Sequence, residues 1–150
     1  MTYDEIFSAF YPLITDNDFF KLPEDYATEL MTGWLHSAIA TPYIRKLFKT
    51  ITMDDEVMEC EYELKNSVDE DSDNDFVISV FSQFMVIQWY RPKVDSQKNI
   101  ARMIGGKEEK NLQSNYKPNM ERLNRLELNL RKYIRDHGTE YNSYLYGGGS

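Results

Sequence analysis

The amino-acid sequence predicts a mainly α-helical fold, a small helical bundle around a central apolar helix at about 72–91 and a long C-terminal helix at about 118–137. Three observations lead to this prediction. Apolar side chains recur at steps of three and four residues along several segments, as they do on one face of an α-helix. Residues 76–90 contain no charged side chain. The chain has 150 residues, of which 41% are hydrophobic, which is enough for one buried core.

Three amphipathic helices are expected in the first third of the chain. Residues 3–11 place apolar side chains at helical spacing before Pro12, and proline does not continue a helix. A second helix begins at Pro23, because proline and the acidic residues after it suit a first turn. It ends before Pro42, and residues 42–48 repeat the helical spacing in a third, shorter helix.

Residues 56–64 have a different pattern, in which apolar and acidic side chains alternate from Met58 to Leu64. Alternation with a period of two is typical of a half-buried strand. A lone strand leaves its backbone edges unpaired. The segment therefore needs either a strand at 51–53, which makes a short hairpin at 51–64, or a strand from another copy of the chain. Helical continuation is the alternative, since Glu and Met favour helices.

The central helix follows an acidic stretch. Asp71 or Ser72 is expected to cap it, and Pro92 is expected to end it. Because residues 76–90 are apolar on most faces, the helix should be buried on most sides, and it is too short and too interrupted by polar residues to span a bilayer.

The remaining elements are helical with a polar interruption. A short helix is expected at 96–104, stopped by two glycines, and then a polar loop of about ten residues. The last helix starts near Pro118 and stops at Gly138, with basic side chains near its negative end. The chain is thus expected to form one helical domain over 1–146 with an acidic loop at 54–75 and extended arms, followed by a flexible Gly/Ser end at 147–150.

Charge is unevenly distributed along this domain. Residues 54–75 contain 11 acidic side chains and 1 basic one, whereas residues 91–150 contain 12 basic and 7 acidic ones. The formal net charge of -8 argues against loose binding of nucleic acid or anionic membrane by the whole surface. A polarised molecule can also stack head to tail with its copies, or its two halves can neutralise each other within the fold.

No motif predicts an active site, so we expect a protein that is not an enzyme and has no cofactor and no metal. The alternating aspartates at 69–75 imitate the start of a calcium loop, but Asn74 and Val80 stand where such a loop needs Gly and a bidentate Glu. Acidic neighbours raise the pKa of a thiol such as Cys60. The lone cysteine and the lack of a leader segment predict a soluble protein of a reducing compartment.

The candidate interface lies on the last helix and the tail after it. Basic side chains form the polar face of the helix, and tyrosines follow it; these residues are Arg122, Arg125, Lys132, Arg135, Tyr141, Tyr144 and Tyr146. The basic face suits a neighbouring subunit or a nucleic-acid backbone, and the aromatic tail suits packing on its own domain or on a partner.

Four segments together resemble a family of small structural proteins of tailed bacteriophages. They are WLHSAIATPYIRKLF at 34–48, YELKNSVD at 62–69, MVIQWYRPKV at 85–94 and RKYIRDHG at 131–138, and the likeness covers most of residues 22–145. The resemblance carries over no catalytic or ligand-binding residue.

The resemblance implies a virion protein that is assembled in the host cytoplasm and acts as a head–tail connector or adaptor of the neck. Such a subunit forms a homo-oligomeric ring that docks on the portal and contacts other neck or tail proteins. It touches encapsidated DNA only in its lumen and binds no membrane. The alternative is a DNA-contacting or regulatory small helical phage protein that uses the basic face of the C-terminal helix.

Overall fold

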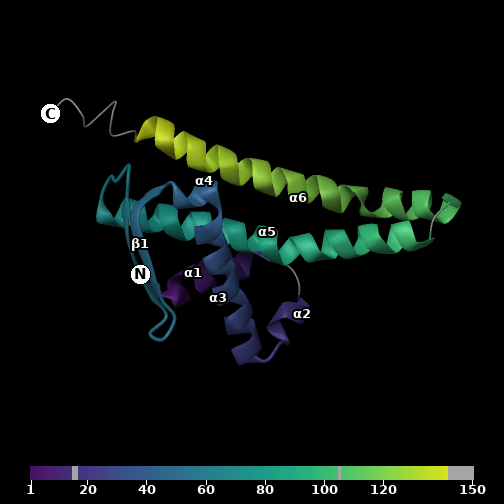
Figure 1. Cartoon of the computed structure of the whole chain (residues 1–150), viewed down its shortest axis with the longest axis horizontal. Coiled ribbons are helices and arrows are strands. Elements are labelled where there is room, and N and C mark those ends of the chain that lie inside the picture. Colours follow the sequence, from purple (N-terminus) through teal and green to yellow (C-terminus); the bar gives the residue numbers. More distant parts are fainter. Residues whose placement is uncertain (15–16, 105, 142–150) are drawn as a thin grey trace.

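The computed structural model of the chain is mainly helical, with one two-stranded antiparallel hairpin (Figure 1). It describes residues 1–14, 17–104 and 106–141, and the side chains of these residues apart from 17–18, 97–102, 104 and 107–116. The predicted fold class is confirmed: a central apolar helix and a long C-terminal helix pack together, and the smaller elements surround one end of this pair.

The chain begins with α1 (Tyr3–Phe10), which agrees with the helix predicted at 3–11. Thr2 and Glu5 form a capping box: the Glu5 N–H donates to Thr2 Oγ1 at 3.2 Å, and the Thr2 N–H donates to Glu5 Oε2 at 2.7 Å. These bonds satisfy backbone donors that a helix start leaves open. The buried face of α1, made of Tyr3, Ile6, Phe7 and Phe10, packs on the central helix.

Four helical elements lie between α1 and the hairpin in the described part of the chain. They are η1 (Tyr11–Leu13), α2 (Asn17–Phe20), α3 (Glu24–Ala40) and α4 (Pro42–Arg45). The helix predicted at 42–48 is shorter than expected, because Phe48 already begins a strand. Helix α3 packs against the central helix through Met31, Leu35 and Ala38.

The alternating segment forms a strand within this chain, so the helical alternative is wrong. Strands β1 (Phe48–Asp54) and β2 (Glu59–Leu64) pair antiparallel, from Phe48 opposite Leu64 to Asp54 opposite Glu59. The sequence did not indicate that the N-terminus bonds to the other edge of β2: the Cys60 N–H donates to the Met1 carbonyl and the Tyr3 N–H to the Met58 carbonyl, both at 2.8 Å. The inner face of β2 is apolar, and its glutamates face solvent.

The last two helices are α5 (Glu70–Ile104) and α6 (Gly106–Glu140), which lie antiparallel (Figure 1). Three predictions about them are wrong. Pro92 lies inside α5 and does not end it, the segment expected as a polar loop of about ten residues is helical, and α6 continues past Gly138 to Glu140. The expected stop after residue 104 is confirmed, because α5 ends at Ile104.

Packing between the two helices explains why Pro92 is tolerated. Proline lacks an N–H and costs about 3 kcal/mol or more in a helix interior. Just before it, however, α5 is bound to α6: Tyr90 Oη donates to Asn119 Oδ1 at 2.7 Å, and Arg91 forms an ion pair with Glu127. Val94 is buried one turn farther along. The interhelical contacts offset the lost bond.

The start of α5 also differs from the prediction, because its cap is neither Asp71 nor Ser72. Asp69 caps the helix by accepting from the Ser72 N–H at 2.7 Å. Asp73 is buried and accepts from Ser67 Oγ at 2.5 Å and from the Val68 N–H at 2.9 Å. The acidic segment 54–75 is therefore not one loop: it contains the hairpin turn, β2, a short connection and the first turns of α5.

Candidate functional site

A cavity of about 550 Å³ lies between α4, the connection after β2 and the C-terminal half of α6. We call it the basic groove, because four of the described residues that line it are Lys or Arg and none of them is Asp or Glu. Its lining is Tyr43, Lys46, Leu47, Lys65, Asn66, Arg131, Ile134, Arg135 and Gly138.

Three segments position these side chains. Helix α6 contributes Arg131 and Arg135, which share one flank because they are four residues apart. The Arg131 guanidinium carbon lies 4.2 Å from the centre of the Tyr43 ring, a distance at which cation–π attraction operates. Lys65 follows β2 directly, and its N–H donates to the Leu47 carbonyl at 2.9 Å, which holds the third segment in place.

The cations of the groove are not neutralised by their surroundings. Within the part of the chain that the structure describes, no carboxylate forms an ion pair with Lys46, Lys65, Arg131 or Arg135. Burial raises the pKa of the Tyr43 hydroxyl, and the Arg131 charge only partly opposes this rise, so the ring stays uncharged. Converging cations around a partly apolar cavity favour an anionic partner.

A surface of opposite charge lies at the turn of the hairpin. Asp54, Asp55, Glu56 and Val57 are exposed, and we call them the acidic tip; Val57 is 61% exposed despite being apolar. The strand pairing places this tip at the far end of the hairpin from Phe48 and Leu64, which adjoin the groove. Six residues of strand separate the two ends by about 20 Å, and Figure 1 shows the hairpin running between them.

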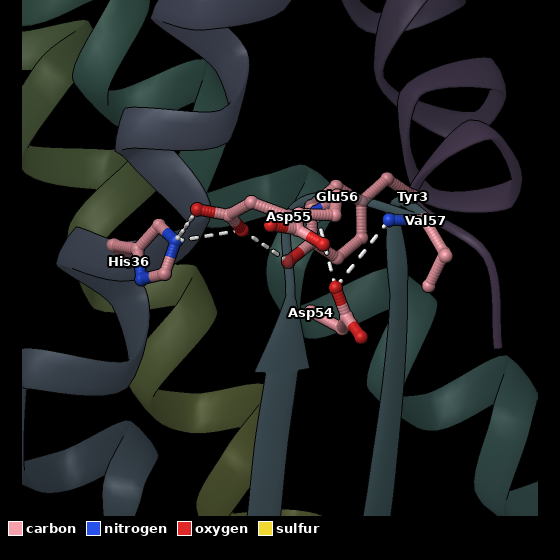
Figure 2. Close-up of polar contacts among 6 residues, drawn as sticks. All are labelled: Tyr3, His36, Asp54, Asp55, Glu56 and Val57. Carbon is pink, nitrogen blue, oxygen red and sulfur yellow. Dashed lines mark hydrogen bonds and ion pairs between the residues drawn. The ribbon is translucent and has the colours of Figure 1, made fainter.

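Polar contacts fix the shape of the tip (Figure 2). Tyr3 Oη donates to Asp55 Oδ1 at 2.6 Å, and His36 Nε2 lies 2.9 and 2.8 Å from the two oxygens of the same carboxylate. Asp54 Oδ1 accepts from the Glu56 N–H at 3.0 Å. The tip is thus held against α1 and α3. Two hydrogen bonds lower the pKa of Asp55. The one from the Tyr3 hydroxyl has the larger effect, and the one with His36 follows it.

We expect Asp55→Asn to destabilise the protein at neutral pH by about 0.5–1 kcal/mol, because hydrogen bonds to a charged acceptor are stronger than those to a neutral one and solvent screens this exposed carboxylate. When folding lowers the pKa of a carboxyl, the charged carboxylate stabilises the folded state at pH values above the unfolded-state pKa, which is near 4. This contribution disappears as the pH falls through the folded-state pKa. Urea melts at several pH values should show the wild type and the variant converging on acidification. A difference that stays constant with pH would contradict the role of the charge.

The structure brings together only part of the predicted interface. Arg135 lines the basic groove, whereas the guanidinium carbon of Arg122 lies 5.2 Å from the Tyr90 ring centre on another part of α6. Arg125 and Lys132 are exposed outside the groove. Tyr141 is 48% exposed. The other two predicted tyrosines, Tyr144 and Tyr146, lie outside the described residues.

The other cations of the groove were not predicted to lie together. Lys46 precedes the first strand and Lys65 follows the second. A hairpin at 51–64 brings its two ends together by antiparallel pairing. The proximity of Lys46 and Lys65, which flank these ends, was therefore predictable from the sequence. Their meeting with Arg131 depends on how α6 packs, which no local pattern indicates.

The aspartates at 69–75 and Cys60 are the residues that the sequence analysis considered for metal binding and nucleophilic chemistry. No group of three or more His, Cys, Asp or Glu side chains in the described part of the chain is arranged to hold a metal ion. Cys60 is buried, and burial is the main cause that raises its thiol pKa. None of the helices described has an apolar stretch long enough to cross a bilayer.

No family model, no curated protein and no solved structure matches the chain.

Proposed function

We propose that the chain is a non-enzymatic structural protein of a bacteriophage neck, a head–tail connector or adaptor subunit that forms a ring and docks on the portal. The observation that supports this proposal is the pair of oppositely charged surfaces at the two ends of one hairpin. A contact between two different surfaces of identical subunits is heterologous, and such contacts generate rings when the rotation closes. In this ring, the acidic tip of each subunit occupies the basic groove of the next.

The two surfaces also match in shape and polarity. The groove is concave, and its apolar lining includes Tyr43, Leu47 and Ile134 between the cations. The tip projects at a hairpin turn and combines the exposed Val57 with acidic neighbours. A volume of about 550 Å³ falls within the range of sites that enclose several side chains or a small ligand. An apolar contact surrounded by charge pairs is the usual anatomy of a protein interface.

The long helices supply a second contact region. The adjoining ends of α5 and α6 extend beyond the other elements (Figure 1), and Met103 there is 86% exposed. A projecting helical pair suits contact with a different protein of the neck, and the portal is the partner that the resemblance implies.

The proposal is tested by mass photometry and negative-stain microscopy of the purified protein, with and without portal. We expect closed rings whose population falls as salt rises, since exposed charges are screened beyond about 10 Å at 0.1 M salt. A chain that stays monomeric with and without portal at every salt concentration, and that forms a salt-sensitive complex with DNA, would overturn the proposal. That result would support the alternative of a DNA-contacting protein acting through the basic face of α6.

A further inference from the structure

A second cavity, of about 390 Å³, lies on the other flank of α6, beside the first turns of α5. We call it the aromatic pocket, because four rings of the described residues contribute to its walls. Its lining is Val68, Ser72, Asp75, Phe76, Tyr133, Asp136, His137, Glu140 and Tyr141. It shares no lining residue with the basic groove.

The rings form a continuous series from one helix to the other. Tyr133, His137 and Tyr141 are four residues apart and therefore stand in one column of α6. Phe76 of α5 stacks on His137 with ring centres 3.6 Å apart, and its centre lies 5.4 Å from that of Tyr133. Tyr141 lies 5.2 Å from His137. Phe76 is buried, whereas Tyr133 and Tyr141 are 37% and 48% exposed, so the two tyrosine rings face the opening.

Carboxylates surround these rings. Asp75 of α5 and the pair Asp136 and Glu140 of α6 are exposed lining residues, and none of them forms an ion pair within the described part of the chain. No Lys or Arg belongs to the part of the lining that the structure describes. Burial lowers the pKa of His137, so its imidazole adds no positive charge at neutral pH. The pocket therefore combines π faces with unpaired negative charge.

We propose that the aromatic pocket binds a guanidinium group. A planar guanidinium stacks on aromatic rings and at the same time donates hydrogen bonds to carboxylates, and this pocket offers both. Tyr133 and Tyr141 supply the faces for cation–π contact, and Asp136 and Glu140 supply the acceptors. The site is independent of the basic groove and adds a cation-binding function to the assembly function proposed above.

Two sources can supply this chemistry, an arginine side chain of a partner protein or a free guanidinium compound. The probes are therefore N-acetyl-arginine amide, its citrulline counterpart and methylguanidine, each titrated into the full-length protein. Citrulline is the suitable control because it has nearly the shape of arginine and no charge. Binding is followed by NMR through the ring signals of Tyr133, His137 and Tyr141.

We expect both guanidinium probes to shift these ring signals in a saturable way and the citrulline probe to leave them unchanged. Tighter binding of the arginine derivative than of methylguanidine assigns the site to a protein side chain, and equal binding assigns it to a small compound. Ring signals that do not respond to either guanidinium probe, or that respond equally to citrulline, would overturn the proposal.

Variants separate this site from a general surface effect. The pair Asp136→Asn with Glu140→Gln and the single change Tyr133→Leu should each weaken binding about two- to fivefold or more. Glu121→Gln removes one charge from an exposed position of α6 outside the pocket and should leave the affinity unchanged. Equal weakening by Glu121→Gln would contradict a specific site. Ring assembly is measured in parallel, so failure of this site is distinguishable from failure of the neck-protein proposal.

Discussion

Replacing Phe81 by alanine is expected to lower the free energy of unfolding by about 3–5 kcal/mol. Phe81 lies in the N-terminal half of α5, is fully buried and stacks on Phe48 of β1 with ring centres 6.1 Å apart. The change removes one of the contacts that join the hairpin to the central helix and leaves a cavity behind. Domains of this size are stable by only about 5–15 kcal/mol, so the variant should lose a large share of its stability.

Phe20→Ala is the matched control, because it deletes the same atoms from a ring that is 54% exposed. We expect a loss of about 1 kcal/mol or less there. Urea denaturation followed by circular dichroism measures both variants, and the dependence of unfolding on urea should be the same as in the wild type. Similar losses in the two variants would show that the core is not centred on α5.

The sequence predicted the elements whose pattern is local. The uncharged residues 76–90 could only be a buried segment, and the alternation at 58–64 identified β2 because side chains of a strand point alternately to two faces. Pro92 led to a wrong prediction, because proline does destabilise a helix interior locally. Here the contacts of Tyr90 and Arg91 with α6 outweigh that destabilisation. The segment after Gly106 looked like a loop because it lacks an apolar stripe, although its Glu, Lys and Gln residues are good helix formers.

The candidate sites were predictable to a smaller extent, since each is formed by segments distant in the sequence. Arg135 was expected at an interface from the basic face of its helix. That it meets Lys46 and Lys65 follows from the packing of α6 beside α4 and the hairpin. In the same way, the column Tyr133, His137 and Tyr141 is visible in the sequence, but the stacking of Phe76 on it depends on the alignment of α5 with α6.

Removing the net positive charge of the basic groove is expected to abolish assembly. The variant Lys46→Glu with Arg135→Glu leaves two cations and two carboxylates in the groove, and the new carboxylates face the acidic tip, where like charges across an interface cost several kcal/mol. The variant Glu56→Lys with Val57→Lys removes the net charge of the tip in the same way and places two lysines opposite the cations of the groove. These four positions are exposed, so folding should be little affected, and mass photometry should find each variant monomeric when it is alone.

Mixing the two variants should restore assembly, because the side chains introduced in one variant can pair with those of opposite charge introduced in the other. The unchanged acidic tip of the groove variant meets an unchanged basic groove, and the introduced lysines of the tip variant meet the introduced glutamates of the groove variant. Lys46→Arg with Arg135→Lys preserves the charge and should assemble as the wild type does, as should Lys117→Glu, which reverses an exposed charge of α6 outside the groove. If wild-type rings form but both reversed variants also assemble alone, the neck-protein proposal stands and the contact lies elsewhere. If the mixture stays monomeric although each variant is folded, the tip and the groove are not partners.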